Sequence, residues 1–249
     1  MGPGDFYTTK IAERFGYLAN WLPNSPINLG DVGIMEGRYF KQLSSLAQLQ
    51  LSFVPRVPQK SANFSYSWEA DIASDSSVGA NIPGMGAAAG LNVKFNNAGA
   101  FVFEITDCTI TDIEDKLSLG HEIKKLFEAK KWEAEWVVID TIVAAGSSTI
   151  LVSTTNNSEI QLSASGDVSK INLTDVSAGL KIKYQTGEIT RILADKGLFP
   201  MFKTSKIKWS FLNRLTRNRG GARYGGHVEE RVVRDYTEKE IWEPILKSE

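Results

Sequence analysis

The sequence predicts an α+β fold: a twisted, mostly antiparallel sheet with long amphipathic hairpins and a few packed helices. Two observations predict this class. Long stretches alternate apolar and polar residues with the period of two of a half-buried strand, and other stretches repeat apolar residues at helical spacing. A sheet of long strands interrupted by a helix is typical of α+β proteins.

The first sixty residues are predicted to form helix and turns. Residues 6–22 place apolar side chains at helical spacing, and Pro23 ends the pattern. The glycine-rich stretch 24–40 predicts turns around a short strand. Leucines between 43 and 51 predict one or two helical turns, and the strand-like residues 52–57 follow them.

The region 61–200 is predicted to form the sheet. Residues 63–73 alternate strictly, and after a connector of small residues the alternation returns over 91–105. Further alternating runs cover about 147–192 and are separated by the predicted turns Asn156-Asn157, Gly166-Asp167 and Thr186-Gly187. Two long amphipathic hairpins are therefore expected. Their apolar side chains are Phe64, Tyr66, Trp68, Ile72, Leu91, Val93, Phe95, Phe101, Phe103, Ile105, Ile150, Val152, Ile160, Leu162, Leu180 and Ile182.

A helix is predicted between the two hairpins. Residues 110–135 have helical spacing, with acids early and lysines late as the helix dipole favours. Thr111 and Glu114 have the spacing of a capping box. The apolar run 136–145 fits either a buried strand or a short buried helix.

Charge is distributed unevenly along the chain. The formal net charge is −1, so any attraction to nucleic acid or an anionic surface must be local. The segment 196–228 holds eight basic residues and no acid, whereas the tail 229–249 holds seven acids and four bases. We therefore expect a single domain over 1–228 that ends in this basic segment, followed by an acidic tail. The candidate contact residues of the basic segment are Lys203, Lys206, Lys208, Arg214, Arg217, Arg219 and Arg223.

Three interpretations of the basic segment stay open. Basic residues interleaved with aromatic ones bind nucleic-acid phosphates while stacking bases, or they lie on anionic lipid. The same composition also fits a solvated face with a few core aromatics.

Motifs of catalysis and metal binding are absent from the sequence. Cys108 lies beside Asp107, which raises a thiol pKa, and the glycines of 83–90 lack the strand and helix that flank a dinucleotide fingerprint. An enzyme that uses Asp112 or Asp115 is the least favoured interpretation. We therefore expect a non-enzymatic protein without cofactor or metal.

No window approaches the length of an apolar membrane helix, and the N-terminus lacks a signal-peptide pattern, so we expect a soluble intracellular chain. A strand of a membrane barrel needs only about 9 to 11 alternating residues. Residues 63–73 and 91–105 meet that requirement, as many soluble sheets also do.

Residues 85–205 resemble the bacterial gasdermins, a family of pore-forming proteins in antiphage defence. The resemblance lies in the order of GMGAAAG, LNVKFNNAGAFVFEITDCTITDIED, VVIDTIVAAGSSTILVSTTNNSEIQLSA, VSAGLKIKYQTGEITRIL and LFPM. Two features depart from the family. Its members often carry an acylated cysteine near the N-terminus, whereas the single cysteine here is Cys108, and the N-terminal region is longer and richer in glycine.

The resemblance implies a sheet held inactive by a short C-terminal peptide. A protease removes the peptide, and many protomers then refold paired hairpins into a membrane barrel. In this chain the inhibitory role would fall on Ile241, Trp242, Ile245 and Leu246 of the tail.

Two functions are carried forward. The first is a latent pore former of antiphage defence and cell death, cytoplasmic until activation, which then binds anionic lipid of the inner membrane and forms a homo-oligomer. The second is a soluble, non-enzymatic binding or assembly module whose basic segment engages nucleic acid or an acidic partner.

Overall fold

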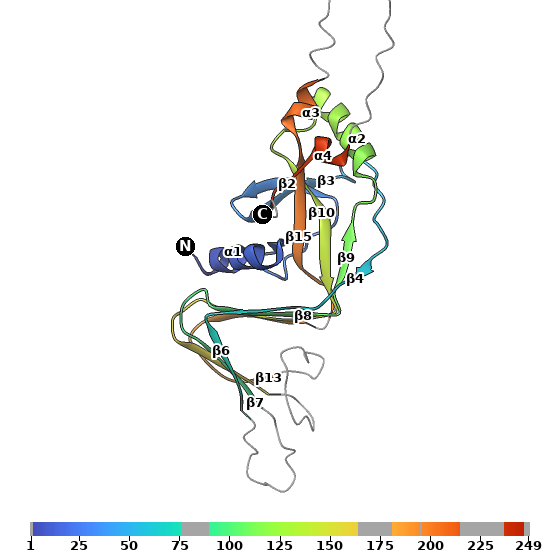
Figure 1. Ribbon diagram of the computed structural model, residues 1–249. Helices are drawn as coiled ribbons and strands as arrows, with labels where there is room; N and C mark the ends of the chain where they lie inside the picture. The colour runs from blue at the N-terminus through green and yellow to red at the C-terminus, as the bar shows by residue number, and fades with distance from the viewer. Residues whose placement is uncertain (1, 76–89, 164–180, 195, 215–236, 247–249) are drawn as a thin grey trace, which may run out of the picture. The chain divides into compact units, whose positions relative to one another are not determined.

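The α+β class with antiparallel sheets is confirmed by the computed structural model, which describes residues 2–75, 90–163, 181–194, 196–214 and 237–246 (Figure 1). The helices are α1 (Pro3–Phe15), α2 (Lys116–Glu128), α3 (Trp209–Arg214) and α4 (Glu238–Ile241). The strands are β1 (Leu18–Ala19), β2 (Asp31–Glu36), β3 (Tyr39–Ser45), β4 (Gln59–Lys60), β5 (Phe64–Trp68), β6 (Ala70–Asp75), β7 (Gly90–Phe95), β8 (Phe101–Thr106), β9 (Thr109–Asp112), β10 (Val137–Ala145), β11 (Ser147–Ser153), β12 (Ser158–Ser163), β13 (Lys181–Thr186), β14 (Ile189–Ala194), β15 (Leu198–Ile207) and β16 (Trp242–Pro244).

Both longer helices begin and end where local chemistry places the boundary. Pro3 stands at the start of α1, and Gly16 ends the helix with a φ of 69°, so the predicted helix stops well before Pro23. Asp115 caps α2 by accepting a hydrogen bond from the Ser118 N–H at 2.9 Å. The predicted capping box at Thr111 was wrong, because Thr111 belongs to strand β9.

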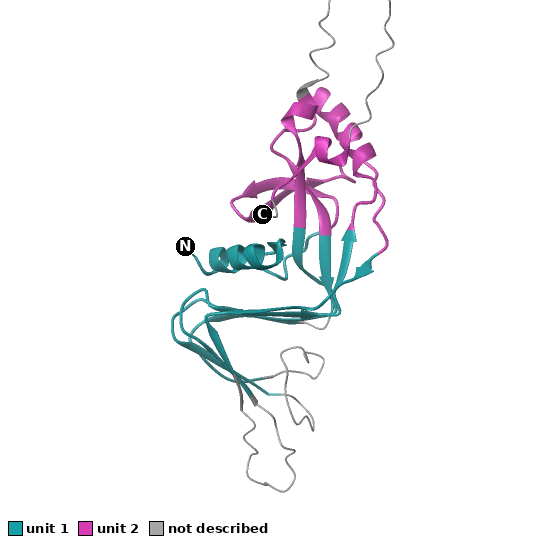
Figure 2. Ribbon diagram, in the orientation of Figure 1, with its two compact units in different colours: residues 1–27, 58–111, 142–202 teal, residues 28–57, 112–141, 203–249 magenta. Residues whose placement is uncertain are grey.

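The described chain divides into two compact units, which Figure 2 shows in different colours. Unit 1 comprises 1–27, 58–111 and 142–202, and unit 2 comprises 28–57, 112–141 and 203–249. One eight-stranded sheet has the order β1-β15-β10-β2-β3, with β16 on β15 and β9 between β10 and β4. The apolar run 136–145 thus forms a strand, β10. The division into 1–228 and an acidic tail stays a prediction.

The helical turns predicted for the leucine-rich stretch after residue 40 were wrong. Residues 39–45 form β3, which pairs with β2 from Asp31↔Ser45 to Glu36↔Tyr39. Pairing with a neighbouring strand outweighs the weak helical preference of the leucine spacing. The strand-like stretch 52–57 forms only an isolated bridge, Pro55↔Ile113.

Candidate functional site

The two predicted hairpins form a pair of four-stranded antiparallel sheets within unit 1. One sheet has the order β14-β11-β8-β5, and the other has the order β13-β12-β7-β6. Equivalent positions in the two orders are held by strands that follow each other in the chain. The hairpins are therefore four long strands, each broken once into two arms. We call β5, β8, β11 and β14 the inner arms, and β6, β7, β12 and β13 the outer arms.

The apolar face of the inner arms is covered by helix α1. Tyr7 and Ile11 of α1 are fully buried in a core with Phe101 and Phe103 of β8. The Tyr7 ring meets the Phe101 ring edge-on at 5.3 Å between centroids. Other residues of α1 contact β5. Phe6 stacks on Trp68, and Phe15 meets Phe64 edge-on. Lys10 lies over the Trp68 ring, and Arg14 lies over the Tyr66 ring. Aromatic pairs and cation–π contacts fix this helix on the sheet.

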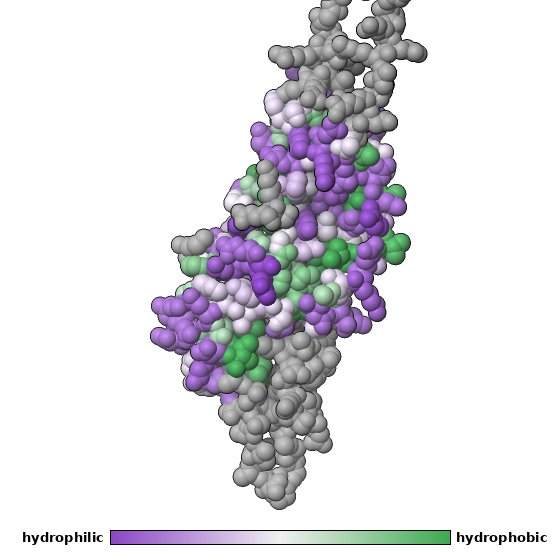
Figure 3. All heavy atoms as spheres, in the orientation of Figure 1, coloured by the Kyte–Doolittle hydropathy of each residue, from purple (hydrophilic) through white to green (hydrophobic). Residues whose placement is uncertain are grey.

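The outer arms contribute to a separate, largely aliphatic core. Leu91 and Val93 of β7 pack with Ile160 and Leu162 of β12, and all four are buried. The inner arms contribute residues of their other face to the same core, including Val102. Ile72 and Ile182, on the edge strands β6 and β13, are 42% and 39% exposed. Figure 3 shows hydrophilic residues over most of the visible face, with hydrophobic ones in small groups among them.

The breaks between the arms lie next to one another and are joined by hydrogen bonds. The Asn96 N–H donates to Glu69 O at 3.3 Å, and the Asn157 N–H donates to Asn96 O at 3.3 Å. The Thr154 N–H donates to Glu188 O at 2.9 Å, which connects the third strand to the fourth. We call the breaks at Glu69, 96–100, 154–157 and 187–188 the corner row.

The opposite face of the outer arms is polar. Asp71 stands opposite Lys94, and Lys94 stands opposite Glu159 on the other side, so charges alternate across three neighbouring strands. The Asn92 side-chain amide donates to Glu159 at 2.7 Å. The two faces of the outer arms therefore differ sharply in polarity.

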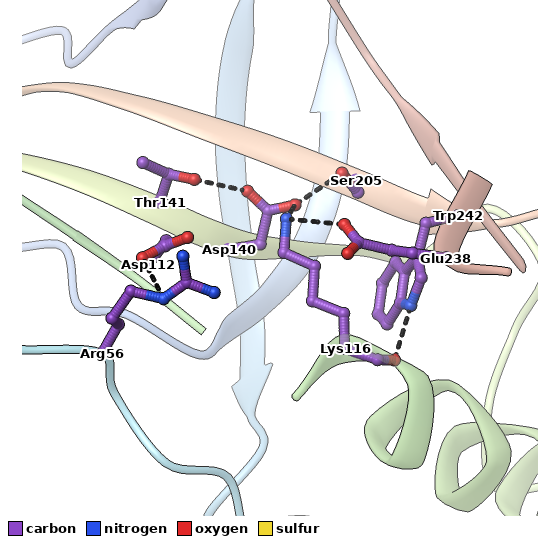
Figure 4. Close-up of polar contacts among 8 residues, drawn as sticks. All are labelled: Arg56, Asp112, Lys116, Asp140, Thr141, Ser205, Glu238 and Trp242. Carbon is purple, nitrogen blue, oxygen red and sulfur yellow. Dashed lines mark hydrogen bonds and ion pairs between the residues drawn. The ribbon is translucent and has the colours of Figure 1, made fainter. Parts of the chain in front are cut away.

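In unit 2 the described part of the C-terminal tail is held by buried contacts. Ile241 and Trp242 belong to the core of the unit, and β16 pairs with β15 through Ile207↔Trp242. The Trp242 indole N–H donates to Lys116 O at 2.7 Å (Figure 4). Gly120 allows this close approach, because a Cβ there would lie 2.6 Å from the Ile241 side chain.

A buried carboxylate lies beside the tail in the same unit. Asp140 is 3% exposed in its side chain and pairs with the Lys116 ammonium at 3.0 Å. The Ser205 hydroxyl donates to the same carboxylate oxygen at 2.5 Å, and the Thr141 hydroxyl donates to the other at 3.0 Å. Lys116 also lies 3.7 Å from Glu238 of α4. Figure 4 shows these side chains converging, and the arrangement compensates the buried charge.

The structure places the predicted strand residues in the two hairpins and the predicted inhibitory residues in unit 2. Ile241 and Trp242 are buried, and Ile245 and Leu246 are half-buried. Lys203 is exposed on β15, Lys206 forms an ion pair with Glu243 at 3.7 Å, and Lys208 donates to Lys239 O at 2.6 Å. Leu180, Arg217, Arg219 and Arg223 lie outside the described residues, and Arg214 is described only as part of α3.

Sequence reasoning missed two parts of this site, namely the role of α1 as a cover and the corner row. The aromatic face of α1 was a detectable signal, but nothing in its spacing names the sheet it covers. Asn156-Asn157 and Thr186-Gly187 were identified as turns, which marks two of the four breaks. The break at Glu69 has no sequence signal, because strict alternation runs through it.

Cys108 is a packed residue of the unit 1 core. Burial and the neighbouring Asp107 raise the pKa of its thiol to about 11. The described residues contain no cluster of three or more side chains of the metal-binding types. Within the same described ranges, every helix is too short or too polar to span a bilayer.

Comparison with solved structures gives a weak fold-level likeness. A cryo-EM structure of the gasdermin A3 membrane pore matches with a TM-score of 0.34 and 9% sequence identity, covering 84% of this chain and 91% of that chain. No protein-family model matches the sequence. No curated protein matches it either.

Proposed function

We propose that this protein is a latent, non-enzymatic pore former, which oligomerises and inserts its two hairpins into a membrane after its C-terminal segment is released. One observation carries the proposal. In the two middle strands, β7–β8 and β11–β12, one set of apolar residues keeps the same alternation through the corner row, yet its members pack into two different cores.

Strands β7 and β8 illustrate this observation. Phe95 and Phe101 are six residues apart and would share one face of a continuous strand. In the fold, Phe95 belongs to the core of the outer arms, and Phe101 belongs to the core under α1. Val152 and Ile160 are divided in the same way on the strand formed by β11 and β12. An extended corner would therefore bring these residues of the two arms onto one face of each middle strand, and the outer arms would then present the apolar outward face that a membrane barrel requires.

Strand length sets which part crosses the bilayer. An arm of six residues spans about 20 Å, which is shorter than the hydrocarbon core of roughly 30 Å. At the corners, the face that is apolar elsewhere carries Asn97, Thr154 and Asn156. We expect these polar residues to lie at the membrane surface. The outer arms would then be the part of the hairpins that enters the lipid.

The edges of the hairpin sheets supply the contacts for oligomerisation. β5 and β6 end one side of the two sheets, and β14 and β13 end the other side. A strand edge in lipid must be paired, because the membrane interior offers no water to its backbone groups. Pairing the β5–β6 edge of one protomer with the β13–β14 edge of the next would satisfy both edges and, repeated around a ring, would close a barrel.

Release of the tail is the proposed activating step. Residues 238–245 complete the core and one sheet edge of unit 2, so a cut before them by a protease leaves a segment held only by non-covalent contacts. The resemblance to bacterial gasdermins implies the setting: antiphage defence, with movement from the cytoplasm to the inner membrane. Anionic lipid is the expected surface for Lys203 and the rest of the basic segment.

The test is dye release from anionic liposomes by the full chain with a protease site introduced between residues 226 and 237. We expect no release before cleavage and rapid release after it. Trp242→Ala in the uncut chain should raise basal release, since it removes a buried anchor of the tail. A cleaved chain that stays folded and neither leaks nor sediments with liposomes would contradict the proposal.

A second candidate function rests on one exposed aromatic residue. Trp209 is 58% exposed beside Lys208, and its ring meets Phe127 at 5.7 Å, which suits stacking on a nucleic-acid base. A salt-dependent shift of a labelled oligonucleotide, lost in Trp209→Ala, would support nucleic-acid binding. No shift at low salt would remove this candidate.

A further inference from the structure

Each of the four breaks in the hairpins contains one residue with a positive φ angle. The angles are 51° at Glu69, 91° at Gly99, 53° at Asn157 and 70° at Gly187. A positive φ is rare for residues other than glycine because the Cβ meets the backbone, and a regular strand has a strongly negative φ. The corner row is thus a line of backbone positions that must change conformation before the strands become continuous.

The two glycines fit positions where a side chain has no room. A Cβ at Gly99 would lie 2.8 Å from the Phe6 ring, and a Cβ at Gly187 would lie 2.7 Å from the Thr155 hydroxyl. Glycine adopts positive φ about as readily as negative φ, so these two corners permit the bent form without strain. The other two corners hold Glu69 and Asn157, whose positive φ disfavours the bent form, with asparagine the better tolerated of the two.

The bent form is stabilised by what the corners bring together. It buries Leu91, Val93 and Leu162 in the core shared by both sets of arms. It also allows Asn97 to donate to the Glu69 carboxylate at 2.6 Å. An extended corner gives up this burial and relieves the backbone at Glu69 and Asn157. Burial of the outer arms therefore favours the bent form, and backbone strain at Glu69 and Asn157 opposes it.

From this opposition we infer that the corner row is a conformational switch, at which the backbone strain of Glu69 and Asn157 sets how readily the outer arms leave their core. The inference rests on the proposed function for its biological meaning. It concerns regulation within the hairpins, separate from the release of the tail.

Opposite substitutions at the same positions should move the switch in opposite directions. Glu69→Gly and Asn157→Gly remove the strain and should slow opening of the outer arms, by roughly fivefold at Glu69 and less at Asn157. Glu69→Val and Asn157→Val place a β-branched residue at positive φ and should speed opening. Asn97→Ala is needed alongside Glu69→Gly, because it removes the same side-chain bond and leaves the φ angle of Glu69 in place.

Unit 2 offers a matched control. Lys130 has a φ of 58° but lies outside the hairpins, just after α2. Like the corner substitutions, Lys130→Gly replaces a residue at positive φ with glycine, so it also relieves local backbone strain and makes the unfolded chain more flexible. It should leave opening of the outer arms unchanged.

The experiment measures amide hydrogen exchange at 90–95 and 158–163 in the full-length variants, and dye release after tail cleavage. We expect slower exchange at both segments in the glycine variants, with α2 unchanged, and slower dye release in the same order. Glycine variants that exchange like Lys130→Gly would overturn the switch, even if the valine variants fail to fold. If no cleaved variant releases dye, the pore function fails, while the exchange rates still decide the switch.

Discussion

The inner and outer arms of the hairpins have the same alternating sequence pattern but are held in different ways. The inner arms lie under α1, with Tyr7 and Phe15 forming aromatic contacts to Phe101 and Phe64. The outer arms depend on a mainly aliphatic core, and their edge residues Ile72 and Ile182 are partly exposed. The difference indicates that one half of each long strand is fixed and the other half is suited to move.

The largest expected effect comes from the core under α1. Phe103→Ala should lower the free energy of unfolding by about 3–5 kcal/mol, because it removes a fully buried ring and leaves a cavity. Urea unfolding monitored by tryptophan fluorescence measures this change. A loss below about 1 kcal/mol would show that the inner arms are not fixed by this core.

A smaller and more local effect is expected in the outer arms. Leu162→Ala should cost about 2–4 kcal/mol and should increase amide exchange in β7 and β12 more than in β8 and β11. Ile182→Ala is the matched control, since its partly exposed side chain loses little burial. An equal increase in exchange over both sets of arms would contradict the distinction between them.

A pH effect is expected on the inner arms. Burial raises the pKa of Glu104 above its usual value of 4.5, and the hydrogen bond from Ser65 lowers it by less. The fold therefore disfavours the charged carboxylate of Glu104. This loss of stability is absent at pH values below the pKa of Glu104 in the unfolded chain, and it is complete at pH values above the raised pKa in the folded chain. Stability should rise as the pH falls from neutral through the raised pKa toward 4.5.

The comparison variant is Glu104→Gln, which cannot titrate. Its midpoint of urea unfolding should vary less over this pH range than that of the natural chain. Identical pH profiles for the two proteins would show that another group causes the change.

The smallest expected effect concerns the hydroxyl of Tyr7. This hydroxyl is fully buried and has no hydrogen-bond partner among the residues that the structure describes, and burial raises its pKa. Tyr7→Phe should therefore stabilise the protein by about 1 kcal/mol, because it removes an unpaired polar group. Thermal unfolding measures the gain. A lower midpoint in the variant would indicate that the hydroxyl stabilises the docked helix.

Periodicity in the sequence predicted the arms but not the way they are joined. Alternation over 63–73 is a local property and identified strand structure correctly, although the fold divides this stretch into β5 and β6. The corner at Glu69 lies inside that pattern, and its positive φ arises from tertiary contacts such as the bond to Asn96. The pattern therefore describes the continuous strand, which is the form that the proposed membrane state would adopt.

Competing local signals explain the other differences from the predicted fold. The leucine spacing after residue 40 favoured a helix, yet pairing with β2 made residues 39–45 a strand. The buried set of Asp140, Lys116 and Ser205 joins three distant segments, so no local spacing could have predicted it. The tail residues Ile241 and Trp242 were identified as apolar, and their burial places them in the core of unit 2.

The most direct test of the central claim is a scan of residues 64–75 with single cysteines carrying an environment-sensitive dye, in the cleaved, liposome-bound protein. Cys108 should not compete for the dye at neutral pH, because it is buried and its thiol pKa is raised to about 11. The account predicts emission shifts that alternate through Glu69 without a break, with position 72 in lipid and positions 71 and 73 in water. Emission that does not alternate, or a dye at position 72 that stays in water, would contradict it.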